Sequence, residues 1–169
     1  MSRQEEITEE FQSITKQILD DSRAELYMDQ HYMALALGAF RYAVNTQLDG
    51  IGTDGEYIAV HPKFLADLYR KNRLLVNRLY LHQVYHCLFR HIFKRIRPDR
   101  ELWFLACDMA VEFLIDSQNQ RSTRVSRTAF RERWRTQISR RIRVLNAEGI
   151  YAVLEQLTPE PSVVSLLQK

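Results

Sequence analysis

The chain has 169 residues, of which 46% are hydrophobic and 27% charged, and this length suits one domain with a real core. Its two cysteines, Cys87 and Cys107, form no C-x-x-C pair, which argues against a disulfide framework and favours a reducing compartment. The N-terminus is charged, and no stretch approaches the roughly 20 apolar residues of a membrane span. We therefore expect a cytoplasmic protein with no membrane segment.

The first third of the chain predicts helices around two short strands. Apolar residues at helical spacing predict a helix over residues 4–26, and a short helix is expected over 30–37. Alternating apolar and polar residues predict strands over 39–44 and 56–60, separated by the turn-rich stretch 45–55. We expect the two strands to pair as a small antiparallel hairpin that lies on helices, because a lone hairpin is marginally stable.

The remainder of the chain predicts further helices. Pro62 suits the first turn of a helix over 63–69, and Asn72 can cap a long helix that is expected to run to about Ile96. Three more helices are expected: one from 99 or 100 through Leu114, one over 130–145 and one over 148–157, with a polar loop over 118–126. The predicted fold is α+β and mostly helical, with a domain over 1–157 and a tail or linker over 158–169.

The long predicted helix carries two histidines four residues apart. In the H-E-x-x-H motif, such a pair shares a helix face and binds Zn²⁺, while the glutamate serves as general base. This chain has His82 and His86, but Gln83 stands at the position of the base. Because a glutamine amide accepts no proton at neutral pH, we expect a helix that holds a metal ion but is poorly equipped for hydrolysis.

A third candidate ligand, Asp108, lies inside an apolar run of the next predicted helix. A buried aspartate needs a cation or several donors, and antiparallel packing of the two helices would bring Asp108 level with His86. Two histidines and an aspartate would leave one coordination position open, as in catalytic zinc sites. Glu112, one turn later, is an alternative ligand or a partner of the ligands. From spacing alone, the favoured interpretation is that Asp108 hydrogen-bonds His82 or His86 without any metal.

The neighbours of these ligands receive supporting roles. His91 lies about 140° around the helix from His86, so it could join the pair only if the helix broke, and no glycine is present to break it. We expect His91 to pack near the ligands. Cys87 and Cys107 point off the ligand face and are expected to be small core residues.

Residues 121–143 carry nine arginines and one acidic residue, Glu132. Spacings of three and four predict a helix with an apolar stripe facing inward and its arginines mostly outside. The stripe consists of Phe130, Trp134, Ile138, Ile142 and Leu145. Candidate residues for binding an acidic partner are Arg131, Arg135 and Arg140. A solvated helical face is the favoured interpretation of this stretch, an acidic-partner or nucleic-acid surface is the alternative, and the absence of a recognised nucleic-acid motif argues against nucleic acid.

Four blocks, in the right order between about residue 30 and residue 157, resemble a known family. They are Thr53-Asp54-Gly55 with its strand and His61-Pro62-Lys63-Phe64-Leu65, the helix from His82 to His91, the run Trp103-Phe104-Leu105-Ala106-Cys107-Asp108, and the segment Asn146 to Tyr151. Together they resemble the metallopeptidase domain of bacterial VWA-like proteins. Three positions depart from its pattern: Gln83 replaces glutamate, Phe104 replaces asparagine, and Glu112 stands near an asparagine position.

This resemblance implies a zincin-like helical core in which His82, His86 and Asp108 hold zinc. It also implies a companion VWA-like domain and a functional link to a MoxR-like AAA ATPase. The favoured hypothesis is a metallopeptidase-like binding or regulatory module with degraded catalysis. The second is an active zinc hydrolase whose base has moved to Glu112 or Glu56. The third is a nucleic-acid-binding protein that uses the arginines of 121–143.

Overall fold

The computed structural model describes residues 3–94 and 97–157, so the predicted tail over 158–169 lies outside the described residues. The chain divides into two compact units. Of the described residues, the first unit comprises 3–92 and 119–125, and the second comprises 93–94, 97–118 and 126–157. No described helix combines the length and the apolar character needed to cross a membrane. The α+β, mostly helical fold class is confirmed.

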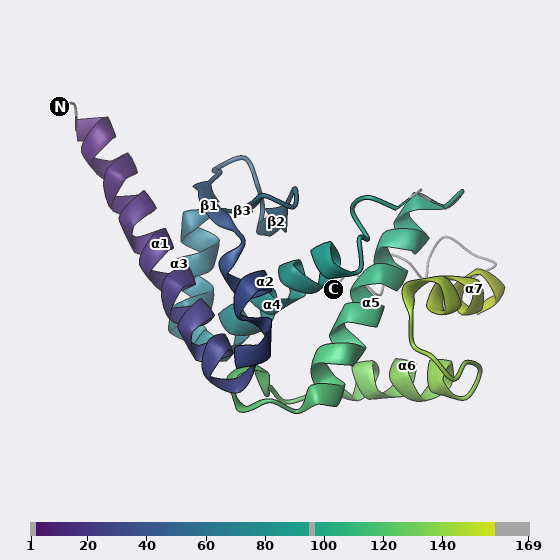
Figure 1. Cartoon of the computed structure of the whole chain (residues 1–169). Coiled ribbons are helices and arrows are strands. Elements are labelled where there is room, and N and C mark those ends of the chain that lie inside the picture. Colours follow the sequence, from purple (N-terminus) through teal and green to yellow (C-terminus); the bar gives the residue numbers. More distant parts are fainter. Residues whose placement is uncertain (1–2, 95–96, 158–169) are drawn as a thin grey trace. The chain divides into compact units, whose positions relative to one another are not determined.

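The first unit is built around the packing of three helices. The long helix α1 (Arg3–Asp29) packs against α3 (Pro62–Lys71) and α4 (Arg73–Leu88) (Figure 1). The short helices η1 (His31–Met33) and α2 (Ala34–Gly38) follow α1, and η2 (Arg121–Thr123) returns to contact α1 and α4. The largest fully buried side chains of this unit are Leu19, Leu26, Leu37, Ile58, Leu65, Tyr80 and Leu81.

The sheet of the first unit differs from the expected antiparallel hairpin. Strands β1 (Arg41–Val44), β2 (Ile51–Thr53) and β3 (Tyr57–Val60) lie in the order β1-β3-β2. β1 runs parallel to β3, with Arg41 opposite Tyr57, whereas β2 is antiparallel to β3, with Ile51 opposite Val60. The antiparallel prediction for the first and last strands is therefore wrong. The turn-rich stretch contains β2, which pairs antiparallel with one edge of β3. β1 therefore pairs with the opposite edge of β3.

A tight turn at Asp54-Gly55 joins β2 to β3 and so forms the antiparallel hairpin of the sheet. Gly55 has a φ of 99°, a conformation that favours glycine, and Asp-Gly is a common hairpin turn. The Asp54 carboxylate accepts hydrogen bonds from the backbone N–H groups of Tyr57 (2.7 Å) and Glu56 (2.9 Å). These two bonds hold the pKa of Asp54 below its usual value, with Tyr57 the larger cause.

Side-chain caps fix where the helices begin. The Asn72 side chain accepts from the Leu74 backbone N–H (2.9 Å) and starts α4, which confirms the predicted cap. Pro62 lies in the first turn of α3, as expected. The Asp99 carboxylate accepts from the Leu102 N–H (2.9 Å) at the start of α5 (Arg100–Gln118). The end of α4 was predicted wrongly, since the helix stops at Leu88 and not near Ile96.

The second unit consists of α5, α6 (Ala129–Ser139) and α7 (Ala147–Leu157). α5 packs on α7, and Ile138 of α6 joins their buried cluster, which includes Trp103, Ala106, Phe113, Ile150 and Leu154. Trp134, Ile142 and Leu145 pack against this cluster as predicted, but α6 ends at Ser139, before the predicted limit of 145. Phe130 is 49% exposed, so its predicted inward orientation is wrong. It lies in the first turn of α6, beyond the cluster.

Candidate metal centre

His82 and His86 lie on one face of α4, one helical turn apart. Their Nε2 atoms are 2.8 Å apart, and their ring centroids are separated by 4.6 Å. Both side chains are half-buried. The i, i+4 spacing therefore does what the sequence predicted, since it directs two imidazole nitrogens toward one point.

Gln83, at the position of a general base, is buried. Its amide offers a carbonyl oxygen and an N–H₂ group, which accept and donate hydrogen bonds but take up no proton at neutral pH. The helix thus keeps the metal-binding pair and lacks the carboxylate that would accompany it in a zinc peptidase.

Buried polar side chains anchor the histidine-bearing helix within the first unit. The Asn77 amide donates to Glu25 (2.6 Å) and to the Ser122 carbonyl oxygen (3.0 Å). The Tyr80 hydroxyl donates to the Leu37 carbonyl oxygen (2.6 Å). These bonds tie α4 to α1, α2 and η2, so the histidines stand on a fixed element. Sequence reasoning missed both anchors, although a polar residue inside an apolar helix was the available signal.

The C-terminus of α4 places His91 beside the pair. Arg90 adopts a left-handed conformation (φ 58°). The His91 N–H donates to the His86 carbonyl oxygen (2.9 Å), and the Arg90 N–H donates to the Cys87 carbonyl oxygen (2.9 Å). This pattern is a Schellman motif, which reverses the chain after the last turn. The His91 ring is thereby turned back against His86, with ring centroids 5.1 Å apart. The expectation that no residue would break the helix here is therefore wrong, since the break is made at Arg90.

The two cysteines are poor candidates for metal ligands. Burial raises the pKa of Cys107 to about 12, so its thiol stays protonated at neutral pH. Burial also raises the pKa of Cys87, whose sulfur lies 3.9 Å from the Thr53 hydroxyl oxygen. Cys107 is a buried core residue as predicted, whereas Cys87 is only half-buried.

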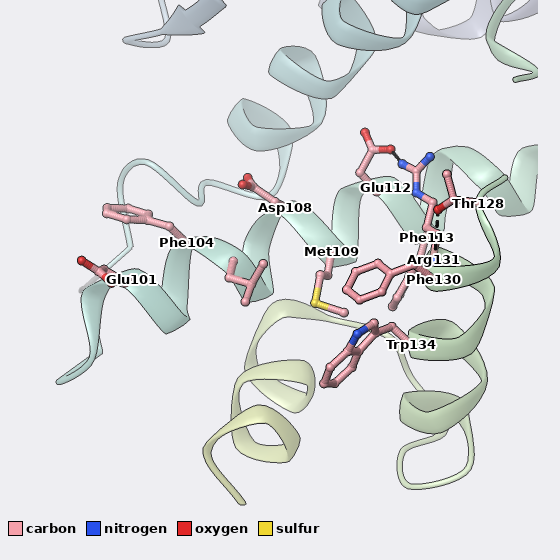
Figure 2. Close-up of a pocket in the computed structure, with 11 residues that line it drawn as sticks. Glu101, Phe104, Asp108, Met109, Glu112, Phe113, Thr128, Phe130, Arg131 and Trp134 are labelled. Carbon is pink, nitrogen blue, oxygen red and sulfur yellow. Dashed lines mark hydrogen bonds and ion pairs between the residues drawn. The ribbon is translucent and has the colours of Figure 1, made fainter. Parts of the chain in front are cut away.

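Asp108 and Glu112 lie on α5 in the second unit. Asp108 is exposed and lies on the wall of a groove between α5 and α6 (Figure 2). Glu112, one turn later, forms an ion pair with Arg131. Because Asp108 and the histidine pair belong to different units, the convergence of the three residues stays a prediction.

Two of the other predicted site residues, Glu56 and Arg135, contact residues of their own units. Glu56, a candidate relocated base, pairs with Arg41 at 3.3 Å, and its side chain is 64% exposed. Arg135 donates to the Phe113 carbonyl oxygen (3.3 Å) and lies over the Phe113 ring. Arg140 is exposed just after α6.

Comparison with known proteins supplies one match. The sequence model of a family described as "Putative metallopeptidase domain" matches residues 15–160. The matched segment includes the histidine pair, Gln83 and Asp108. No curated protein and no solved structure matched the chain in these comparisons.

Proposed function

This chain belongs to the metallopeptidase-domain family whose model it matches over residues 15–160, and on that premise we propose that it is a zinc-binding module with degraded catalysis. In this proposal the zinc ligands are His82, His86 and Asp108. The module binds its target in a cytoplasmic assembly and hydrolyses it weakly or not at all.

The distance between the histidine nitrogens carries the proposal. Two zinc–nitrogen bonds of about 2.05 Å at a tetrahedral angle place their nitrogens about 3.3 Å apart. The Nε2 atoms of His82 and His86 are 2.8 Å apart, a distance that also suits a hydrogen bond from one ring to the other. To bind one zinc ion, the two Nε2 atoms must therefore move apart by about half an ångström. The helix that carries them is already fixed by its buried hydrogen bonds.

The donor types support zinc. Two imidazoles and one carboxylate from His82, His86 and Asp108 make a nitrogen and oxygen set that leaves a coordination position open. A bound zinc ion would supply Lewis acidity, which polarises a substrate carbonyl and lowers the pKa of water. The residues of this chain fit such an ion, because both histidines are preorganised.

The base position is the reason for proposing degraded catalysis. General-base assistance is typically worth about 10²–10⁴ in rate, and Gln83 cannot provide it. The two relocated-base candidates are Glu112 and Glu56, and each lies beside an arginine. In each case the arginine already occupies the carboxylate that the relocated-base hypothesis needs. An active hydrolase with a relocated base is therefore the less supported alternative.

Partners complete the proposal. By resemblance of its motif blocks, the module would work with a VWA-like domain and a MoxR-like AAA ATPase. The exposed arginines of the second unit suit an acidic partner surface. Four of these arginines form no ion pair within residues 97–157: Arg133, Arg140, Arg141 and Arg143. Charge of this kind governs encounter rate and partner choice more than affinity.

Elemental analysis of protein purified without a metal-affinity tag tests the zinc proposal. We expect about one zinc ion per chain and a melting temperature that falls on chelation, because metal binding is linked to folding. His82→Ala and His86→Ala should lose the metal and its stabilisation. His31→Ala is the matched control, since His31 is exposed and lies on another element. Sub-stoichiometric zinc in wild type, or equal zinc in His82→Ala, would refute the site.

A further inference from the structure

The groove between α5 and α6 in the second unit has an apolar lining to which the proposed zinc site assigns no role. Figure 2 shows side chains of both helices directed into it, and its volume is about 600 Å³. That volume lies in the range of ligand sites, which are mostly apolar with a few polar groups. The apolar lining consists of Phe104, Leu105, Met109, Phe113, Phe130 and Trp134.

Two aromatic side chains at this groove remain unusually open to solvent. Phe104 is 47% exposed and Phe130 is 49% exposed, although both line a concave surface. Phe113, by contrast, is buried, while Met109 and Trp134 are partly buried and pack against the core cluster. The lining therefore combines a fixed base with exposed aromatic rings, an arrangement that suits the side chain of a partner molecule.

The charged residues of the groove are mostly acidic. Glu101, Asp108 and Glu112 lie along the α5 side, and Arg131 is the cation that lines the groove with them. Arg131 forms an ion pair with Glu112 and lies 4.0 Å from the Asp116 carboxylate. Its charge is thus offset by those two acids, and Glu101, which is exposed, adds a negative charge at the groove.

We infer that this groove binds a peptide segment in which a bulky aromatic or aliphatic residue is flanked by lysine or arginine. The apolar lining would take the bulky side chain, and the carboxylates would favour the flanking cations. This inference names the substrate class of the proposed zinc module and rests on that function, because Asp108 belongs both to the groove and to the ligand set.

Intrinsic fluorescence can report binding directly. The chain has two tryptophans; Trp103 is 1% exposed in the core, whereas Trp134 lines the groove. The probe is the peptide acetyl-Lys-Phe-Lys-amide, titrated into the full chain. We expect a saturable change in Trp134 emission, with at least about tenfold weaker binding of acetyl-Lys-Gly-Lys-amide and of acetyl-Glu-Phe-Glu-amide.

Variants locate the binding in the groove. Phe130→Ala should weaken binding about tenfold, as truncation of an aromatic anchor does. Glu101→Gln should weaken it about threefold through lost attraction. The matched control is Phe93→Ala, because Phe93 is 59% exposed in the same unit and does not line the groove. Equal losses in Phe93→Ala and Phe130→Ala would overturn the assignment.

The titration is run with stoichiometric zinc and again with a chelator, beside the zinc analysis of the same samples. A chain that holds zinc but gives no saturable response would overturn this inference and leave the zinc module standing. A chain without zinc that still prefers the cationic aromatic peptide would support the groove and count against the metal. Equal affinity for the acidic and basic peptides would overturn the charge selection and with it the inference.

Discussion

The rings of His86 and His91 meet in an edge-to-face arrangement at the end of α4, with their centroids 5.1 Å apart. His91 is buried, so it covers part of His86 while the Nε2 atom of His86 stays directed toward His82. Ring contacts of this kind restrict the rotamer of a ligand and so prepare it for a metal.

His91→Ala should weaken zinc binding about tenfold, because His86 loses the ring that restricts it. His91→Phe should keep most of the affinity, since it retains a planar ring at this position. Competition titration with a chromophoric chelator measures both constants. Affinities equal to wild type in His91→Ala would show that the contact does not position the ligand.

Arg90→Gly should raise the free energy of unfolding by about 1 kcal/mol. Arg90 occupies a left-handed conformation (φ 58°), which costs energy for a residue with a Cβ atom and is favourable for glycine. Arg133→Gly, in the interior of α6, is the opposite control and should lower the same free energy by about 1 kcal/mol. Urea unfolding followed by circular dichroism measures both, and a lower midpoint for Arg90→Gly would contradict the prediction.

Gln83→Glu should raise peptide hydrolysis by about 10²–10⁴ over a wild-type rate near background, because it restores a carboxylate that accepts a proton. The two side chains are nearly isosteric, so zinc content and stability should change little. The test is turnover of a peptide library with stoichiometric zinc, with Gln137→Glu on the exposed face of α6 as control. Robust wild-type cleavage that disappears on substitution of Glu112 or Glu56 would instead support the relocated base.

Arg135→Gln should lower the free energy of unfolding by about 1 kcal/mol. The Arg135 guanidinium donates to the Phe113 carbonyl oxygen and lies 5.8 Å from the centre of the Phe113 ring, and glutamine reproduces neither contact fully. Arg133→Gln should change the same quantity by less than about 0.5 kcal/mol, because Arg133 is exposed. If chemical denaturation shows the same loss of unfolding free energy for Arg135→Gln and Arg133→Gln, the contacts of Arg135 with Phe113 do not stabilise the fold.

The exposed arginines 133, 140, 141 and 143 should bind acidic polypeptide. Replacing all four with glutamine should abolish retention on immobilised polyglutamate and leave the unfolding midpoint close to wild type. Duplex DNA is the comparison ligand. Tight DNA binding with an affinity that falls steeply with salt would favour the nucleic-acid alternative over an acidic protein partner.

Local geometry explains what the sequence predicted well. Four-residue spacing on a helix is sufficient to place His82 beside His86, and caps such as Asn72 and Asp99 act within their own turn. The missing base is equally local, because it depends only on the identity of Gln83. The helical, α+β class and the metallopeptidase-domain family follow from the same periodicity and motif blocks.

Tertiary structure alone decided the features that join distant segments. β1 pairs in parallel with β3 because β2, from the intervening loop, occupies the antiparallel edge. Arg90 takes a conformation that its residue type disfavours, because the chain must turn back at the end of α4. Glu112 pairs with Arg131, and α5 and α6 together form the groove. The energy of each of these contacts depends on partners remote in sequence, whose pairing no local pattern specifies.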